Sequence, residues 1–276
     1  MKSRLFGLLF GASLILNQDE IKAQSDKNPQ KEIILNSKEN NFDLLKDYLE
    51  KKGFKIDSLL KDPRFEIYES ISERFKKAPE IKINNLEQYK ERIGYFKKKD
   101  KIQEFIGNNL EKLLEAEKNY KIEKEVIASI LGIESDFGKA AGKYNPFNVY
   151  ISLYSENYKK EFSKTQLEEL LRFCKRNNLD IFELKSSYAG AISYAQFIPS
   201  SLNRWFIGKE VYSMENNILS VANYLSYFKK RTGSLEKAVY SYNPSKLYVQ
   251  AVLDLAKDAK KLEKFEKIKG NQEDKK

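Results

Sequence analysis

One carboxylic acid in this sequence lies where burial would change its chemistry. Residues 126–138 read VIASILGIESDFG. At about 100° per residue, the apolar side chains of a helix over this stretch fall within one arc, and Glu134 falls near the middle of that arc. An ionised carboxylate removed from water without a partner is strongly disfavoured, so its pKa rises. A carboxylic acid that keeps its proton near neutral pH can act as a general acid.

The alternative for such a residue is a glutamate whose carboxyl reaches solvent from the helix end or pairs with a lysine. The nearest other acid, Asp136, lies about 200° around the helix from Glu134. If the helix is regular there, the two carboxylates cannot face one substrate. This motif alone therefore does not predict a site of two paired carboxylates.

The absence of histidine and the single cysteine limit which catalytic groups the chain can use. The 276 residues include no histidine, which excludes histidine-based nucleophilic machinery, proton shuttles and metal sites. Acid–base chemistry must come from carboxylates, lysines or tyrosines. The one cysteine, Cys174, lies in a helical pattern. We interpret it as a core residue, because it has no partner for a disulfide or a cysteine-rich metal site.

The formal net charge of +10 indicates a polyanionic partner, which could be nucleic acid, anionic lipid or an acidic cell-wall polymer. The sequence has no zinc finger, no helix-turn-helix with a basic recognition face and no aromatic RNA-binding strand. Nucleic acid is therefore not the expected partner. An apolar content of 41% at this length predicts a folded chain of one large or two modest domains.

The N-terminus has the pattern of an export signal. Lys2 and Arg4 precede the apolar run LFGLLFGASLIL, which is short for a bilayer span and suited to a signal peptide. We expect a signal peptide over residues 1–23, a flexible leader over 24–40, and a location in the periplasm or cell envelope. No cysteine lies directly after the run, so a lipoprotein anchor is not expected. An uncleaved N-terminal anchor is the alternative.

Helical periodicity of apolar residues predicts a mainly α fold. The segments before residue 119 carry apolar stripes without a chemical constellation, which favours a scaffold role. The lysine-rich tail after Lys264 is expected to be disordered. The expected helices are 42–53, 64–77, 86–98, 100–120, 123–138, 149–154, 163–177, 216–230 and 238–252, the last divided at Asn243-Pro244.

A second motif, SSYAGAISYAQFIPSS, occupies residues 186–201. Small side chains allow close backbone approach to a ligand, while Tyr194 and Gln196 supply a stacking face and amide hydrogen bonds suited to a sugar. The alternative is a tightly packed turn beneath the core. A third motif, YSYNPSKLY, covers residues 240–248.

These three motifs, in this order, resemble the lytic murein transglycosylases of the membrane-bound B type, glycoside hydrolase family 103. The similarity extends over about residues 42–260. The resemblance implies a lysozyme-like helical catalytic core at residues 119–264, an additional N-terminal helical domain at 41–118 and a disordered basic tail at 265–276.

The resemblance also implies an activity on the MurNAc-β-1,4-GlcNAc bond of peptidoglycan. Glu134 would protonate the glycosidic oxygen as general acid, and its carboxylate would then take the proton from the C6 hydroxyl of the same MurNAc. A 1,6-anhydro ring closes instead of water being added. This agrees with the residues, because hydrolases with two carboxylates need a second acid at a defined separation, and none was found beside Glu134.

Further site residues follow from the resemblance by matching motif positions. The implied substrate-binding residues are Ser187, Tyr194, Gln196, Tyr242, Asn243, Tyr248, Lys159 and Lys160. The lysine pair stands where the family often has two arginines that would contact peptide carboxylates. The family usually has glycine where this chain has Ser193 and Ala195, so the backbone is expected to approach the glycan less closely. The acidic calcium loop of some members is missing, and we expect no metal and no cofactor.

Three other functions stay open at this point. A lysozyme-type hydrolase would use water in place of the C6 hydroxyl. A non-catalytic peptidoglycan-binding protein would bind the glycan strand without cleaving it. A cytoplasmic nucleic-acid binder is the third. The expected partners are peptidoglycan glycan strands, with association with other cell-wall enzymes left open, and the chain is expected to be a monomer.

Overall fold

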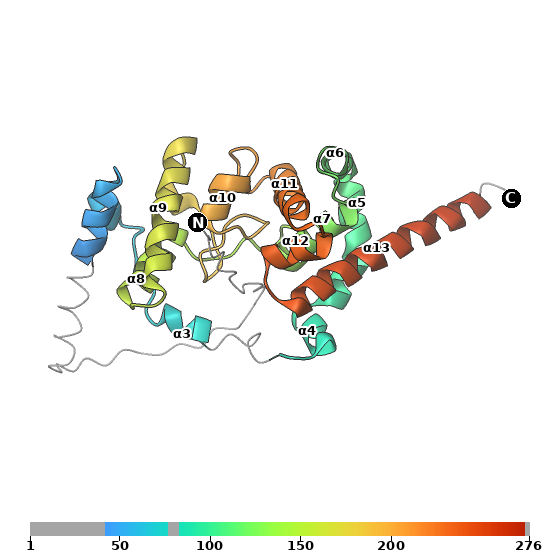
Figure 1. The fold of residues 1–276 in the computed structure, drawn as a ribbon, viewed down its shortest axis with the longest axis horizontal. Helices are drawn as coiled ribbons and strands as arrows, with labels where there is room; N and C mark the ends of the chain where they lie inside the picture. Colours follow the sequence, from blue (N-terminus) through green and yellow to red (C-terminus); the bar gives the residue numbers. More distant parts are fainter. Residues whose placement is uncertain (1–41, 77–82, 274–276) are drawn as a thin grey trace.

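The structure, a computed structural model, describes residues 42–76 and 83–273 of the chain. The predicted signal peptide, 1–23, and leader, 24–40, lie outside these residues. The described part is built from helices, and its β-type pairings are isolated bridges, which confirms the mainly α fold (Figure 1). The helices are 42–51, α2 (Asp57–Leu60), α3 (Ile71–Lys76), α4 (Leu86–Arg92), α5 (Tyr95–Asn108), α6 (Leu110–Tyr120), α7 (Lys124–Ser135), α8 (Pro146–Ser155), α9 (Lys160–Asn177), the short 3-10 helix η2 (Ile181–Glu183), α10 (Pro199–Trp205), α11 (Met214–Thr232), α12 (Leu235–Tyr242) and α13 (Lys246–Glu273).

Helix α7 lies at the centre of the fold. All of its residues from Glu125 to Ser135 are buried, and α5, α6, α11 and α13 pack around it (Figure 1). A helix that is apolar on nearly all sides is stable only inside a protein. Glu134 is therefore carried by an element with no solvent-facing side.

Several predicted helix boundaries are wrong. The chain breaks at Gly94, which has a left-handed backbone with φ of 66°, and at Asn109, instead of between residues 98 and 100. The helix predicted over 64–77 is helical only from Ile71. Helix α8 begins at Pro146, because the Asn145 side chain caps it and proline suits the first turn. These breaks depend on caps and turn conformations that apolar periodicity does not report.

The predicted disordered tail is corrected over residues 265–273, which continue α13. The tail is rich in lysine and glutamate, which are good helix formers, and a packed helix propagates at one hydrogen bond per residue. Figure 1 shows the C-terminal part of α13, in red, extending beyond the other helices. No helix within the described ranges has an apolar stretch long enough to cross a bilayer.

Helices on both sides of the predicted domain boundary at 118/119 pack on one another. Helix α5 packs on α7 and α13, α6 packs on α11, and α4 packs on α13. Buried apolar side chains from both sides, from Leu45 to Ala259, belong to one cluster. The division into 41–118 and 119–264 stays a prediction.

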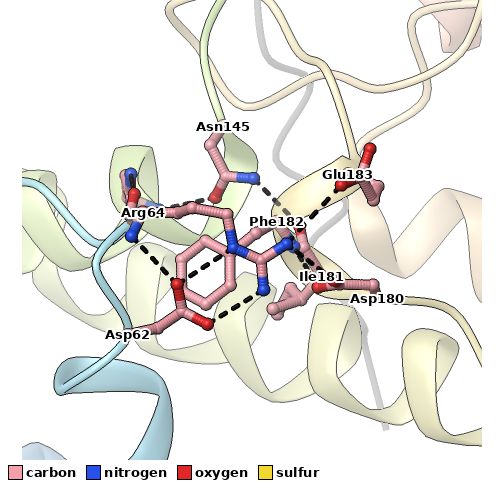
Figure 2. Close-up of polar contacts among 8 residues, drawn as sticks. Asp62, Arg64, Asn145, Asp180, Ile181, Phe182 and Glu183 are labelled. Atoms are coloured by element: carbon pink, nitrogen blue, oxygen red, sulfur yellow. Dashed lines mark hydrogen bonds and ion pairs between the residues drawn. The ribbon is translucent and has the colours of Figure 1, made fainter.

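A polar cluster around Arg64 joins the N-terminal segment to the loop around η2 (Figure 2). The guanidinium donates from Nε and Nη2 to the two oxygens of Asp62, each at 2.9 Å. Its Nη1 donates to Asp180 Oδ2 at 2.7 Å and lies 3.5 Å from Glu183 Oε1. The guanidinium also lies over the ring of Phe182, 4.8 Å from its centroid. The hydrogen bonds that Asp62 accepts from the Arg64 guanidinium and from Arg64 N lower its pKa to about 2.

The same cluster fixes the start of α8 against this loop. Figure 2 shows Asn145 beside Ile181, to whose carbonyl oxygen it donates at 2.9 Å. The Asn145 side chain also donates to Leu184 O at 3.2 Å and accepts from two backbone N–H groups of α8. Immediately after, Ser186 N donates to Tyr144 O at 2.7 Å, and Tyr144 N donates back to Ser186 O at 3.1 Å. Residues 186–197 are therefore anchored at their first residue.

The approach of Gly142 to this segment is close. Gly142 has φ of 92°, and a Cβ at this position would lie 2.0 Å from Ser186 O. We expect Gly142→Ala to lower the free energy of unfolding by about 3 kcal/mol, because a positive-φ penalty is combined with a collision against backbone. The matched control, Gly53→Ala, has φ of 84° with nothing within 4 Å of the added Cβ, and should lose only about 1 kcal/mol. Equal losses in urea unfolding would contradict the close approach.

Candidate active site

The carboxyl group of Glu134 is enclosed by protein near the C-terminal end of α7. The residue is 4% exposed. Its Oε1 accepts a hydrogen bond from the Tyr248 hydroxyl at 2.7 Å, and its Oε2 is buried without a hydrogen-bond partner. Burial raises the pKa of Glu134 to about 8, and the hydrogen bond from Tyr248 opposes this rise. The group is therefore an acid that holds its proton at neutral pH, as the apolar arc around it predicted.

The third motif supplies two tyrosines beside this carboxyl. Tyr248 lies in the first turn of α13 and is fully buried. Tyr242 ends α12, and its hydroxyl donates to Ala195 O in the second motif. Burial, followed by the charge of Glu134, raises the pKa of both phenols. The structure thus brings the three motifs together at Glu134.

Asn243, in the third motif, also has a buried side-chain oxygen without a hydrogen-bond partner. It follows α12 with an extended backbone and is 3% exposed, and its Oδ1 has no hydrogen-bond partner. Helix α13 starts three residues later, at Lys246. The break predicted at Asn243-Pro244 is therefore confirmed.

Within residues 186–201, the predicted side chains bond mainly to their own loop. The Ser187 hydroxyl accepts from Ala191 N at 3.3 Å, and Gln196 Nε2 donates to Ser193 O at 2.8 Å. Ser193 has φ of 71°, the left-handed region that favours glycine, which gives a physical reason for the glycine usual in the family at this position. Tyr194 is partly exposed, and its ring lies 3.5 Å from where a Cβ on Gly138 would be. The second motif therefore contacts the turn that follows α7.

Asn217 is a supporting residue that the sequence interpretation missed. Its Oδ1 accepts from Ala195 N at 2.9 Å, and its Nδ2 donates to the carbonyl oxygens of Val211 and Ser213. The side chain is fully buried. Asn217 lies on the apolar face of the helix predicted at 216–230, and this position could have indicated its role. A buried amide needs hydrogen-bond partners, which are most often backbone groups.

Lys159 and Lys160 lie in a second group of side chains, with α3, α8 and α9. The Lys159 ammonium lies 5.4 Å from the ring centroid of Phe75, and burial lowers its pKa. The Lys160 ammonium lies 4.8 Å from the ring centroid of Tyr154. Phe75 also packs against Tyr188, with centroids 5.3 Å apart. Lys159 is therefore connected to the second motif through Phe75, whereas the contact of Lys160 is with α8.

The described residues contain no group of three or more acidic, histidine or cysteine side chains placed to hold a metal ion. Asp136 also stands apart from Glu134, because its carboxylate is paired with Lys98 and Lys101 of α5, at 3.9 and 3.4 Å. The arrangement is one buried carboxyl group with tyrosine neighbours.

Tyr248→Phe is expected to raise the pKa of Glu134 further. The variant keeps the ring and removes the hydrogen bond that favours the carboxylate form of Glu134. The midpoint of the Glu134 titration should therefore rise by about one to two pH units. A ¹³C NMR titration of glutamate carboxyls measures it, with the Glu134 signal assigned by its loss in Glu134→Gln. Tyr242→Phe is the control, because its hydroxyl donates to Ala195 O instead. A shift of the same size in both variants would show that the hydrogen bond is not the cause.

Comparison with known proteins agrees with this geometry. The chain matches the family described as "Transglycosylase SLT domain" over residues 37–235. It is 30% identical over 115 residues to the membrane-bound lytic murein transglycosylase B of Escherichia coli (strain K12), a match that covers 40% of this chain and 32% of that protein. The chain therefore matches less than half of the length of this curated relative.

Solved structures of lytic transglycosylases share the fold. The catenated lytic transglycosylase SltB1 of Pseudomonas aeruginosa has a TM-score of 0.71 at 18% identity, covering 81% of this chain and 97% of its own. SltB3 of the same organism, in complex with NAG-anhNAM-pentapeptide, has a TM-score of 0.71 at 17% identity, covering 81% and 79%. The fold is the lysozyme-like one that the motifs implied. With more than half of its residues matched to the family and its three motifs gathered around one buried glutamate, the chain belongs to the transglycosylase SLT domain family.

Proposed function

We propose that this chain is a peptidoglycan lytic transglycosylase that cleaves the MurNAc-β-1,4-GlcNAc bond and leaves 1,6-anhydro-MurNAc ends. Family membership supports the reaction class. One SltB3 structure contains NAG-NAM-pentapeptide, which supports the proposed substrate class. Another contains NAG-anhNAM-pentapeptide, which supports the proposed anhydro product. The observation that carries the proposal is the buried Glu134 carboxyl, whose pKa is raised by burial, with one oxygen bonded to Tyr248 and the other without a partner.

In the first step, Glu134 acts as general acid. Oε1 is occupied by the Tyr248 hydroxyl, so the proton is assigned to Oε2, which donates it to the glycosidic oxygen. The bond between that oxygen and C1 of MurNAc breaks, and its electron pair leaves with the GlcNAc hydroxyl. The hydrogen bond from Tyr248 favours the carboxylate that forms, and so lowers the energy of the charge that develops.

In the second step, the same carboxylate acts as base. It takes the proton from the C6 hydroxyl of MurNAc while the C6 oxygen bonds to C1 and closes the anhydro ring. One proton leaves Glu134 and one returns, so the enzyme ends as it began and no water is consumed. A second carboxylate, which hydrolases need to activate water or to attack C1, has no role in this sequence.

The other predicted residues are assigned to substrate binding. The open Oδ1 of Asn243 can accept a hydrogen bond from a sugar hydroxyl or acetamido N–H group. Ser187, Tyr194 and Gln196 belong to a loop that Tyr242 ties to the catalytic region, and we assign them to the saccharide subsites. Lys159 and Lys160 are assigned to carboxylates of the stem peptides, which complement their charge.

A substrate in the cell wall places the protein outside the cytoplasm. We propose the periplasm or the cell envelope as its location, consistent with the relation to an envelope transglycosylase and with the export signal read from the sequence. Peptidoglycan glycan strands are the proposed partner of a monomeric enzyme, with no cofactor. Association with other cell-wall enzymes is compatible with this activity and is not required for it.

The test is a digest of purified murein by the parent protein and by Glu134→Gln, with mass analysis of the released fragments. The parent is expected to release fragments with anhydro ends, and the variant to release them on the order of a thousandfold more slowly. Fragments with reducing ends would establish a lysozyme-type hydrolase instead. Binding to murein without release of fragments by the parent would establish a non-catalytic wall-binding protein.

A further inference from the structure

The turn that follows Glu134 has an unusual backbone. Asp136, Phe137 and Gly138 have φ values of 48°, 60° and 87°, three consecutive residues in the left-handed region. Aspartate adopts this region more readily than most side chains, whereas Phe137 does so only where surrounding contacts hold it. The turn begins two residues after Glu134, and any relaxation of it would move the end of α7.

One contact that holds the turn is the ring of Phe137. It packs on Phe105 of α5 with centroids 4.9 Å apart, and it lies over Gly132, where a Cβ would be 2.7 Å from the ring. Phe137 N donates to Leu131 O at 3.2 Å. The ring thus anchors the turn both to its own helix and to α5.

The second contact is electrostatic and also comes from α5. Asp136 lies 3.4 Å from the Lys101 ammonium and 3.9 Å from that of Lys98. Lys98 is 5% exposed, and its Nζ lies near Gly94 at the start of α5, where the helix dipole disfavours a cation. Burial and the neighbouring Lys101 lower the pKa of Lys98, and the charge of Asp136 opposes them. The buried ammonium therefore requires the Asp136 carboxylate at this place.

We propose that Asp136 is a positioning residue for Glu134, and that Lys98 and Lys101 of α5 hold it in place. The inference rests on the proposed function for its kinetic readout. It assigns a role in the reaction to α5, which the sequence favoured as scaffold. The turn also reaches the second motif, because Gly138 lies against Tyr194. A shift of the turn would therefore displace both the acid and a residue assigned to saccharide binding.

The test compares two carboxylates that both pair with lysines of α5. Asp136 has a 28% exposed side chain. Asp258 of α13 has a 24% exposed side chain, pairs with Lys99 at 3.0 Å and accepts from the Tyr95 hydroxyl at 3.0 Å. Both aspartates are changed to asparagine, and kcat and KM on soluble glycan strands are measured below the unfolding temperature of each variant.

Asp136→Asn is expected to lower kcat by about tenfold or more with little change in KM, because small misplacement of a catalytic group has effects of this size. Asp258→Asn should keep the parent kcat, and Asp136→Glu should recover part of the loss. If Asp136→Asn fails to fold, Asp136→Asn/Lys98→Met removes the buried ammonium with its counter-charge and should fold with the same low kcat. A parent-like kcat in the folded Asp136 variant would overturn the proposal.

A second readout does not depend on activity. Displacement of Glu134 would weaken its hydrogen bond from Tyr248, so the midpoint of the Glu134 carboxyl titration should rise in Asp136→Asn and stay in place in Asp258→Asn. An unchanged midpoint in Asp136→Asn would also overturn the positioning role. If the parent protein releases no murein fragments, the proposed function fails, and this titration still decides the role of Asp136.

Discussion

Glu134→Gln is expected to reduce the rate of murein cleavage on the order of a thousandfold or more, because one side chain supplies the proton in the first step and removes a proton in the second. The amide has the shape of the acid and can do neither. The rate of fragment release from purified murein, measured at equal concentrations of folded protein, gives the ratio.

Glu125→Gln is the matched control for this loss. Glu125 lies on the same helix and is also 4% exposed, but its carboxylate is paired with the Lys124 ammonium at 2.6 Å. Glu125→Gln should lower the free energy of unfolding and leave the rate of murein cleavage unchanged. Equal losses of rate in the two variants would point to damage to α7, and a Glu134→Gln protein as fast as the parent would contradict the catalytic assignment.

The same substitution should change how stability depends on pH. The folded chain holds the Glu134 proton up to about pH 8, while the unfolded chain releases it near 4.5. As pH rises between these values, release of the proton favours the unfolded state, so the parent loses stability through this group and the loss is complete above about pH 8. Glu134→Gln has no proton to release there. Between pH 5 and pH 8 the parent should lose about 3 to 4 kcal/mol more than the variant.

Urea unfolding at several pH values measures this difference. Only the change with pH is compared, because the buried amide has its own energetic effect that does not depend on pH. Parallel pH profiles for the two proteins would mean that Glu134 ionises normally in the folded state. That result would remove the physical basis for its role as an acid at neutral pH.

The sequence predicted the parts of this site that depend on one element or one motif. Apolar residues around α7 predicted the burial of Glu134, and Asn243-Pro244 predicted the break between α12 and α13. Asp136 points away from Glu134 toward α5, as expected, but the reason differs, because α7 ends at Ser135 and Asp136 lies in the left-handed turn that follows. In each case the information lies within a few neighbouring residues.

The parts that the sequence did not predict depend on contacts between distant segments. Arg64 is bonded to Asp180 across 116 positions, and Lys101 to Asp136 across 35 positions. No local pattern indicates such pairs. The break at Gly94 was missed for a related reason, because one glycine inside a helical pattern becomes a boundary only where the fold turns there. The contacts behind the role proposed for α5 are therefore visible only in the structure.

The most direct test of the account is a murein digest in water enriched in heavy oxygen. In the proposed reaction, the Glu134 carboxylate takes the proton from the C6 hydroxyl and the C6 oxygen closes the ring. The released MurNAc ends should then carry no heavy oxygen and should weigh one water less than hydrolysed ends. Incorporation of heavy oxygen at C1 of MurNAc by the parent protein would contradict the account, because water would then be the attacking group.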